Sequence, residues 1–245
     1  MSITLVITSC GRLDLLSKTI ESLKSVDEFE FEEKIIIDDS GKRNVGKEII
    51  KKYSSDFKII INKKNIGQIR SIDKAYSEVK TKYIFHCEDD WFFYRSGFIK
   101  DSIEILSNHE EVVCVSFRDY EKDLAKHCPY EKITNMKIIN NLGFCVSDKT
   151  NHGWAGFTFN PSVIRVGDYK DNGPYQSIGH ELQISQFYLD KSKYLCFLNE
   201  SAVSHIGWEQ HIYNKHNYFD SRIKVYMPSK LLKLLVRIKR FIKSA

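Results

Sequence analysis

The sequence predicts an α/β fold with a Rossmann-like, mostly parallel central sheet that helices cover on both faces. Two observations carry this prediction. Over the first half of the 245-residue chain, short apolar segments of strand character alternate with segments in which apolar residues recur at helical spacing. A hydrophobic fraction of 42% and only 4 prolines are typical of a well-folded globular protein.

The first half contains nine elements by this pattern. Helical spacing is clearest at Leu15, Leu16, Ile20 and Leu23, and the second strand stops at the turn signal Asp38-Asp39-Ser40-Gly41. The predicted strands are residues 3–8, 34–37, 57–61, 83–87 and 112–117, and the predicted helices are residues 14–25, 45–53, 69–79 and 98–106. Strands that alternate with helices in this way form parallel sheets.

The second half is less regular. Residues 118–153 are polar, with helix and loop signals mixed. Order returns with residues 154–159, a helix at 181–189 and short strands at 194–198 and 202–205. We expect one domain over residues 1–226, made of halves 1–117 and 118–226, and a separate C-terminal helix over residues 227–245.

Polar residues follow three of the predicted strands, and parallel strands present their carboxyl ends at one sheet edge, where ligands bind. This rule brings together Thr8-Ser9, Asp38-Asp39 and Glu88-Asp89-Asp90. Three adjacent carboxylates repel one another unless a cation offsets them, and oxygen ligands suit Mg²⁺ or Mn²⁺. The alternative is a solvated turn after a strand.

The first strand exit, Thr8-Ser9-Cys10-Gly11-Arg12, contains neither GxGxxG nor GxxxxGK[ST], which argues against a dinucleotide fold and a P-loop. Its backbone and hydroxyls can contact a base or ribose, and Arg12 can approach a phosphate. Asp38 and Asp39 offer acceptors for a base imino group or ribose hydroxyls, although an Asp-rich turn explains them equally well.

A further candidate segment, Asn65-Ile66-Gly67, precedes the helix whose first turn contains Arg70. A cation is unfavourable at a helix N-terminus. Arg70 therefore indicates an anionic partner nearby, unless it is an ordinary surface arginine.

Composition excludes several classes of protein. Six scattered cysteines form no CxxC, which makes a zinc site or disulfides unlikely, and four of them lie in or beside apolar runs, so we expect these four to be reduced core residues of a cytosolic protein. The N-terminus lacks a basic region and a cleavage site, and no apolar stretch is long enough to span a bilayer. Nucleic-acid binding is not indicated, because the basic excess lies in the last 17 residues and leaves 31 basic against 32 acidic residues elsewhere.

In order and spacing, the segments Ile3–Ser9, Ile36–Ser40, Asn65–Gly67 and Ile84–Asp90 resemble the nucleotide half of a family-2 glycosyltransferase of the GT-A type. The resemblance implies a GT-A fold. It implies that Glu88 and Asp90 occupy the outer positions of a DxD motif, where they bind Mn²⁺ or Mg²⁺, with Glu88 departing from the usual aspartate. It places Asp89 and Arg70 at the nucleotide and its diphosphate, and Asp39, or less often Asp38, at the base.

The second half would then bind the acceptor. The resemblance places Trp154 and Gly156 at the donor-sugar and acceptor pocket, and His180-Glu181 at the family's acidic pair, with Glu181 as general base. The alternatives are a core strand and a first-turn acid favoured by the helix dipole. His205 ends a late strand and is a third metal ligand by resemblance, or a histidine bonded to backbone.

These assignments imply a metal-dependent, inverting glycosyltransferase. It would move a sugar from a nucleotide-sugar donor, with UDP as the family's commonest nucleotide, to a hydroxyl of a glycan or lipid-linked acceptor in polysaccharide, capsule or lipopolysaccharide synthesis. Two alternatives remain. The first is a non-catalytic nucleotide-sugar or glycan-binding module, and the second is a metal-dependent nuclease or phosphotransferase built on Glu88-Asp89-Asp90.

The C-terminal segment Ser229–Lys243 has apolar residues on one helical face and basic residues on another, with six basic residues and no acidic one between Ser229 and Ala245. Such a helix binds well to an anionic membrane surface. We therefore expect a cytoplasmic protein attached peripherally to the inner face of the plasma membrane. The alternative is a helix that packs on the core or binds a partner.

Overall fold

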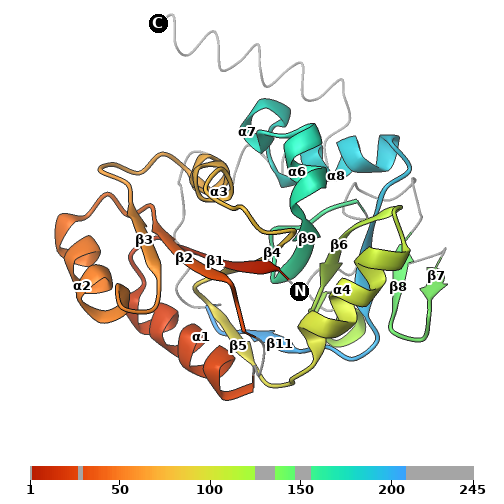
Figure 1. Cartoon of the computed structure of the whole chain (residues 1–245), viewed down its shortest axis with the longest axis horizontal. Helices are drawn as coiled ribbons and strands as arrows, with labels where there is room; N and C mark the ends of the chain where they lie inside the picture. Colours follow the sequence, from red (N-terminus) through yellow and green to blue (C-terminus); the bar gives the residue numbers. More distant parts are fainter. Residues whose placement is uncertain (1, 27–29, 125–135, 147–155, 208–245) are drawn as a thin grey trace, which may run out of the picture. The chain divides into compact units, whose positions relative to one another are not determined.

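The computed structural model describes residues 2–26, 30–124, 136–146 and 156–207, and within them nine strands form one sheet. They are β1 (Ile3–Ser9), β2 (Glu33–Asp38), β3 (Lys58–Ile61), β4 (Tyr83–Glu88), β6 (Val112–Ser116), β7 (Met136–Ile139), β8 (Gly143–Val146), β9 (Ser162–Arg165) and β10 (Tyr194–Leu198). Their order across the sheet is β3-β2-β1-β4-β9-β6-β10-β8-β7 (Figure 1).

Most of these strands run in one direction. β1 pairs in parallel with β2 and β4, β2 with β3, and β6 with β10. β9 is antiparallel to both of its neighbours, β4 and β6, and β8 is antiparallel to β10 and β7. The prediction of an α/β fold with a mostly parallel central sheet is confirmed.

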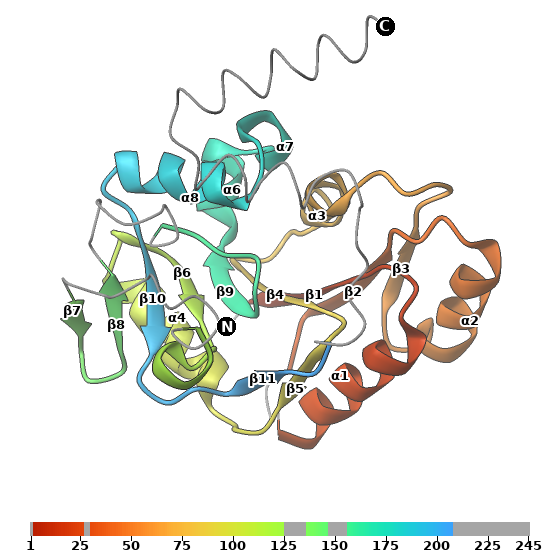
Figure 2. The same ribbon diagram turned by 180° about the vertical axis from the view of Figure 1, so that it is seen from behind.

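Helices cover both faces of the sheet (Figures 1 and 2). The helices are α1 (Leu13–Val26), α2 (Arg43–Tyr53), α3 (Gln68–Tyr76), α4 (Phe98–Asn108), α6 (Val166–Asn172), α7 (Tyr175–Ile178) and α8 (Glu181–Asp190), with a π-helical turn at Tyr120–Leu124. One core lies under α1, α2 and α4, and the other lies under α3, α6, α7 and α8. Because both faces are covered, all seven residues of β1 are buried.

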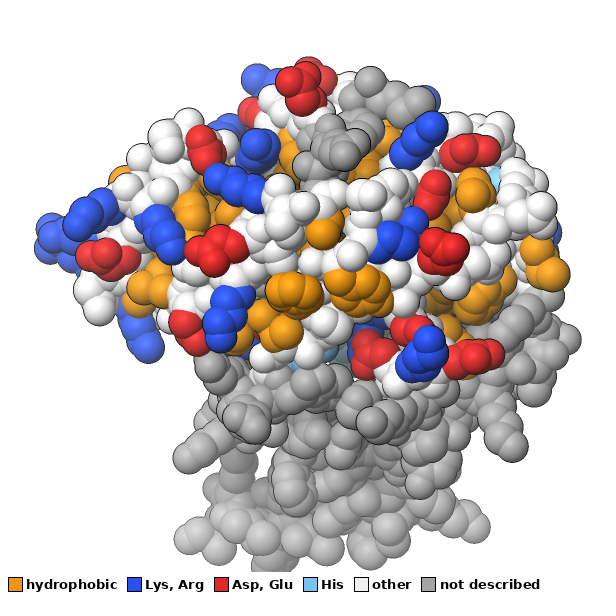
Figure 3. Space-filling view, turned by 90° about the horizontal axis from the view of Figure 1, so that it is seen from below, with side chains coloured by type: hydrophobic (Ala, Val, Ile, Leu, Met, Phe, Trp, Pro, Cys, Tyr) orange, Lys and Arg blue, Asp and Glu red, His pale blue; other side chains and the backbone are white. Residues whose placement is uncertain are grey.

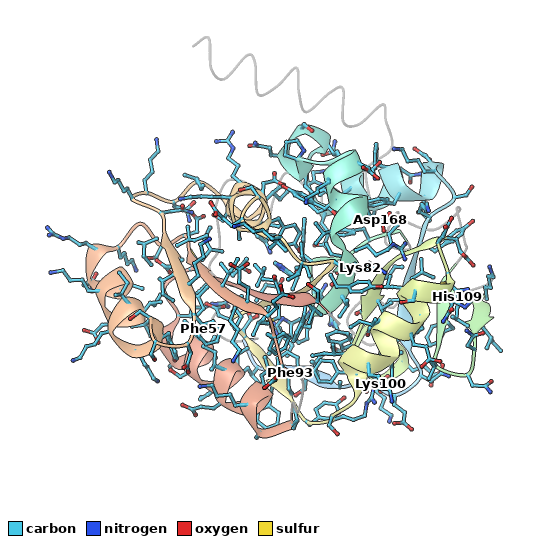
Figure 4. All side chains as sticks on the ribbon, in the orientation of Figure 1. Phe57, Lys82, Phe93, Lys100, His109 and Asp168 are labelled. Atoms are coloured by element: carbon cyan, nitrogen blue, oxygen red, sulfur yellow. The ribbon has the colours of Figure 1, made fainter. Side chains whose placement is uncertain are left out.

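The core under α1, α2 and α4 contains the apolar stripe that the sequence predicts, including Leu16, Ile20 and Leu23. Phe57 and Phe93 belong to the same core and lie on this side of the sheet (Figure 4). The opposite core is rich in aromatic residues. Tyr76 of α3 contacts Tyr169 edge to face, with 5.0 Å between ring centroids.

Asp73 joins α3 to the second half of the chain. Its carboxylate accepts hydrogen bonds from the backbone N–H groups of Tyr175 and Gln176, both at 2.8 Å, and from the hydroxyl of Tyr169 at 3.0 Å. All three donors come from α6 and α7. This single buried carboxylate therefore positions the helices that precede α8.

A second, two-stranded sheet consists of β5 (Trp91–Phe93) and β11 (Val203–His205), which pair antiparallel. The sequence predicts a strand that ends at His205, but it does not predict β5. Three adjacent acidic residues after a strand usually indicate a turn, so a new strand immediately after them is not expected. Trp91 and Phe93 point into the core, and Phe92 is exposed. The pairing sets His205 opposite Trp91.

The segment predicted at 154–159 differs from a strand over its described part. Phe157, Thr158 and Phe159 are buried. The backbone N–H groups of Phe157 and Phe159 donate to the Ser185 hydroxyl and the Glu181 carboxylate of α8, and the Thr158 carbonyl accepts the Cys114 thiol. The strand that follows, β9, starts one residue after Pro161. Because β9 is antiparallel, residues 156–161 lie at the same edge of the sheet as the carboxyl ends of β4 and β6.

No helix among the described residues is long and apolar enough to cross a membrane. The compact unit formed by Met1–Gly207 is followed by a second unit, Trp208–Ala245. The predicted C-terminal helix, the predicted boundary at residue 226 and Trp154 all lie outside the described residues.

Candidate active site at the strand exits

Asp89 follows β4 directly and is fully buried. Its Oδ2 atom accepts a hydrogen bond from the Ser9 hydroxyl at 2.7 Å and from the Cys10 backbone N–H at 3.4 Å, and its Oδ1 atom accepts one from the Arg12 guanidinium. Burial raises the pKa of Asp89 to about 6, although Arg12 and Ser9 oppose this rise. The β1 and β4 exits are thereby joined through one carboxylate.

Arg12 also donates a hydrogen bond to Asp90, at 2.7 Å to the Oδ2 atom. The same Oδ2 atom is hydrogen-bonded to His205 Nε2 at 3.2 Å. Burial acts to raise the pKa of Asp90, but the contacts with His205 and Arg12 outweigh it and leave the pKa lowered. Gly207 packs directly on this carboxylate, since a Cβ atom there would lie 2.5 Å from Oδ2.

Glu88 has different partners from the other two acids. Its Oε2 atom accepts the indole N–H of Trp91 at 2.8 Å. Burial and the neighbouring charge of Asp90 raise the pKa of Glu88 well above its usual range. The acidic triplet thus divides into a pair bridged by Arg12 and one carboxyl that bonds to Trp91.

The two acids at the β2 exit organise the surrounding loops. Asp38 accepts the Gly11 backbone N–H at 3.0 Å and the Ser40 hydroxyl at 2.5 Å. Asp39 accepts the backbone N–H groups of Ile66 and Gly67, both at 2.8 Å, and the side-chain amide of Asn62 at 2.9 Å. Both aspartates are buried, so this edge is held rigidly by hydrogen bonds.

Of the remaining nucleotide-site candidates, Asn65 and Thr8 lie at the strand exits, whereas Arg70 lies on the surface of α3. Asn65 donates its amide to the Asp39 carbonyl at 2.9 Å and lies beside Cys10. Thr8 is buried, and its hydroxyl has no hydrogen-bond partner among the described residues. Arg70 is exposed on the first turn of α3 and forms no ion pair within the described part of the chain, as expected of the surface arginine given above as the alternative.

Glu181 lies in the first turn of α8. Its Oε1 atom accepts the Thr158 hydroxyl at 2.8 Å and the Phe159 backbone N–H at 3.2 Å. Burial raises the pKa of Glu181, and these bonds and the charge of Arg118 act against that rise. The charge of Glu181 also contributes to the raised pKa of Glu88.

The flanking candidates in the second half have clear structural positions. His180 is exposed immediately before α8, and its backbone N–H donates to the Gln183 side chain at 3.0 Å. Gly156 is buried against α8, where its backbone N–H donates to the Ser185 hydroxyl at 2.9 Å. A Cβ atom at Gly156 would overlap the Ser185 carbonyl oxygen. Gly156 therefore allows the close approach that holds Thr158 and Phe159 beside Glu181.

Arg118 is a site residue that sequence reasoning missed. It follows β6, is 7% exposed, and lies over the Trp91 ring with its guanidinium carbon 5.1 Å from the ring centroid. It donates to Asp123 at 2.8 Å and to Asn160 at 3.1 Å. The rule that located the other candidates, a polar residue at the carboxyl end of a parallel strand, applies to Arg118 as well.

The donor set fits a divalent ion in part. Asp90 offers a carboxylate oxygen, which suits Mn²⁺ or Mg²⁺, and His205 offers an imidazole nitrogen, which suits Mn²⁺ better than Mg²⁺. Within the described residues no three His, Cys, Asp or Glu side chains are placed to hold a metal ion together. Glu88 lies against Trp91, so Asp90 and His205 are the protein ligands that the geometry supports, with other positions open to a ligand's oxygens.

Comparison with known proteins agrees with this architecture. Residues 4–159 match the sequence profile described as glycosyl transferase family 2. No curated protein matches the chain in sequence.

Several solved structures share the fold at low sequence identity. TarS 1–349 of S. aureus in complex with UDP-GlcNAc has a TM-score of 0.56 at 13% identity, over 85% of this chain and 61% of that one. The mannosyltransferase PcManGT of Pyrobaculum calidifontis with GDP-Man and Mn²⁺ has a TM-score of 0.56 at 9% identity, over 80% and 56%. GalNAc-T7 with UDP, GalNAc and Mn²⁺ has a TM-score of 0.57 at 14% identity, over 86% and 44%. The chain thus covers less than two thirds of each of these proteins, and the likeness shows a GT-A fold.

Proposed function

The chain belongs to glycosyl transferase family 2, and on that premise we propose that it transfers a sugar from a nucleotide-sugar donor to a hydroxyl of a glycan or lipid-linked acceptor, with inversion at the anomeric carbon. One observation carries the proposal. The exits of β1, β2 and β4 are tied together by buried carboxylates, while the second half of the chain holds Glu181 against Thr158 and Phe159, which lie at the same edge of the sheet.

The first half of the site would bind the nucleotide. Asp38 and Asp39 hold the loops 8–12 and 62–67 around the β2 exit through backbone N–H groups. The base and ribose would bind between these loops. Arg12, which is only 16% exposed and lies over Asp89 and Asp90, is the cation nearest the acidic pair and would face the diphosphate.

A divalent ion held by Asp90 and His205 would supply positive charge to the leaving diphosphate when bound. The chain's own contribution there is to orient these two side chains. His205 is fixed by its pairing opposite Trp91 and by the contact of the two rings, with 4.9 Å between centroids. Ile206 further donates its backbone N–H to the Asp90 carbonyl at 2.9 Å.

Glu181 would act as the general base. Its oxygen Oε1 is oriented by two hydrogen bonds, and its raised pKa makes it a stronger base than an ordinary glutamate. It would accept the proton of the acceptor hydroxyl as that oxygen attacks the anomeric carbon. Glu88 is another carboxyl at this edge, but its Oε2 atom is bonded to the indole N–H of Trp91 at 2.8 Å, which makes it a poor candidate for a covalent nucleophile. A single displacement, with inversion, follows from this pair.

The test is Glu181→Gln, measured with a radiolabelled nucleotide sugar and an acceptor. We expect transfer to fall by about 10²–10⁴-fold, the usual contribution of a general base, while nucleoside diphosphate binding measured by calorimetry stays unchanged. Glu78→Gln is the matched control, because Glu78 pairs with Lys58 on the surface and is about half exposed. Full transfer by Glu181→Gln would exclude Glu181 as the base.

Calorimetry with UDP, GDP, CDP and ADP, each with and without Mn²⁺, separates this proposal from the alternatives. Binding of one nucleoside diphosphate together with sugar transfer supports the transferase. Binding with no transfer to any acceptor supports a binding module. Cleavage of a nucleic acid would support a nuclease, although basic and acidic side chains are interspersed over the described part of the face in Figure 3 and form no continuous basic surface there.

We also propose a role in polysaccharide, capsule or lipopolysaccharide synthesis, with the protein cytoplasmic and attached to the inner face of the plasma membrane through Ser229–Lys243. The support is the composition of that segment, which has a basic and an apolar face. A lipid-linked acceptor would make attachment at the membrane surface useful to such an enzyme.

A further inference from the structure

Arg12 occupies the centre of the acidic pair. Its Nη1 atom donates to Asp90 Oδ2 at 2.7 Å, and its Nη2 atom donates to Asp89 Oδ1. The exposed fractions of the three side chains are 16% for Arg12, 8% for Asp90 and 0% for Asp89. Two buried carboxylates side by side would repel each other strongly without a cation between them.

The backbone holds Arg12 in this place from both sides. Gly11 has a φ of +85°, a conformation that favours glycine, and donates its N–H to Asp38. On the other side, the Arg12 carbonyl accepts the Leu16 N–H at 2.9 Å at the start of α1. A cation is disfavoured at a helix N-terminus, so the two aspartates account for an arginine at this position.

The oxygen that Arg12 binds is also one that a divalent ion would need. Asp90 Oδ2 contacts both Arg12 Nη1 and His205 Nε2. An ion held by Asp90 and His205 would therefore compete with the guanidinium for the same carboxylate. Two cations cannot share this buried position without strong repulsion.

We propose that Arg12 is the resident cation of the Asp89–Asp90 pair and competes with a divalent metal ion for it, so that the metal binds tightly only together with a nucleoside diphosphate. This inference rests on the proposed function, because it requires a diphosphate that the Arg12 guanidinium can bind in place of the two aspartates when the metal ion takes its position. Metal and nucleotide then bind with positive coupling, each raising the affinity of the other.

The first experiment uses the full chain without nucleotide and measures free Mn²⁺ by electron paramagnetic resonance during titration with MnCl₂. Arg12→Met removes the competing charge, and we expect it to bind Mn²⁺ at least about tenfold more tightly than the unaltered protein. Arg95→Met is the matched control. Arg95 pairs with Asp101 and the Glu200 carbonyl instead of the acidic pair, so the Arg95→Met protein should bind Mn²⁺ with the affinity of the unaltered protein. Equal or weaker Mn²⁺ binding by a folded Arg12→Met protein overturns the proposal.

A second variant and a second measurement decide the question if Arg12→Met does not fold. Arg12→Lys keeps one positive charge but cannot bridge two carboxylates with a planar fork, so we expect Mn²⁺ affinity above that of the unaltered protein. In the unaltered protein, UDP or GDP should raise Mn²⁺ affinity at least about tenfold, and Arg12→Lys should reduce that factor. If Arg12→Lys binds Mn²⁺ with the affinity of the unaltered protein, the competition is contradicted. It is also contradicted if a nucleotide that binds the unaltered protein leaves its Mn²⁺ affinity unchanged.

These outcomes are separable from those of the proposed function. The titration without nucleotide tests Arg12 alone, whereas failure of every nucleoside diphosphate to bind would reject the transferase and leave the Arg12→Met result intact.

Discussion

His86 is the buried residue whose chemistry is least expected in its surroundings. It lies in the middle of β4, 1% exposed, with the rings of Tyr76 and Phe159 at 5.7 and 5.9 Å between centroids. Neither ring nitrogen has a hydrogen-bond partner within the described residues. Burial lowers the pKa of His86 to about 3, from 6.5 for an ordinary histidine, so the folded protein keeps it neutral.

We predict that His86 makes the protein less stable as the pH falls. Between pH 6.5 and about 3 the unfolded chain binds a proton at this position that the folded chain does not bind. The free energy of unfolding should therefore fall by about 2 kcal/mol from pH 7 to pH 5 on account of this one group. Urea denaturation of His86→Leu should lack this component. The exposed His180 is the control, and His180→Leu should keep the slope; a slope unchanged in His86→Leu would refute the prediction.

The pH dependence of transfer is a second prediction at this scale. Because the pKa of Glu181 is raised, the acid limb of kcat should lie above the range of an ordinary glutamate, with activity lost as the pH falls through that pKa. Protonation of Asp89, with a pKa of about 6, should weaken nucleotide binding and appear in KM instead. An acid limb of kcat at the pKa of an ordinary glutamate would argue against Glu181 as the base.

Single residues were predictable where a strand-end rule applied and were missed where the outcome depended on the direction of a side chain. The rule brings Ser9, Asp38 and Asp89 together, as the structure shows. It does not show that Glu88 bonds to Trp91, or that Arg12 bridges two aspartates, because those choices depend on side-chain direction at the turn after β4.

At the scale of elements, the longer periodic segments were predicted well, whereas several short elements were missed. α1, α2 and α4 bury stripes of large apolar residues over three turns, which sequence spacing reveals. β5, β9 and α7 have three or four residues each. Too few residues repeat in such elements for periodicity to appear, and tertiary pairing decides their form.

The packing of Gly156 against α8 gives a prediction for this scale. Gly156→Ala would force a Cβ atom onto the Ser185 carbonyl, so we expect the free energy of unfolding in urea to fall by about 2 kcal/mol or more. Gly167→Ala is the control within α6, where a Cβ atom meets nothing within 4 Å. That variant should be unchanged or more stable by up to about 1 kcal/mol. Equal stability of the two variants would show that α8 can move aside.

For the molecule as a whole, the alternation of strands and helices predicts the α/β class, and the resemblance of four motifs predicts the GT-A fold, both of which are confirmed. The residue roles stay predictions. The predicted division into halves 1–117 and 118–226 rests on the change in regularity along the chain. Regularity does not reveal which strands pair, so it could not predict that β9 of the second half pairs with β4 and β6 of the first.

The membrane proposal belongs to this scale, because it concerns the whole chain at a surface. Replacing Lys230, Lys233, Arg237 and Arg240 by Gln in the full chain should weaken sedimentation with vesicles that contain anionic lipid, by about 1 kcal/mol for each charge near the surface. Replacing Lys58 and Lys82, exposed on the body, should have little effect. Equal sedimentation of both variants would exclude Ser229–Lys243 as the anchor.

β9 has a consequence for how this polypeptide can be divided. It comes from the second half of the chain, yet it is inserted between β4 and β6 of the first half and bonds to both. A fragment that stops at Phe117 would leave these two strands with open hydrogen-bonding edges and no partner between them. Expressed alone, such a fragment should be insoluble, whereas supplying residues 118–245 in trans should rescue it. The two halves of this chain therefore cannot be exchanged by simple fusion, and chimeras of this protein need their junctions outside the sheet.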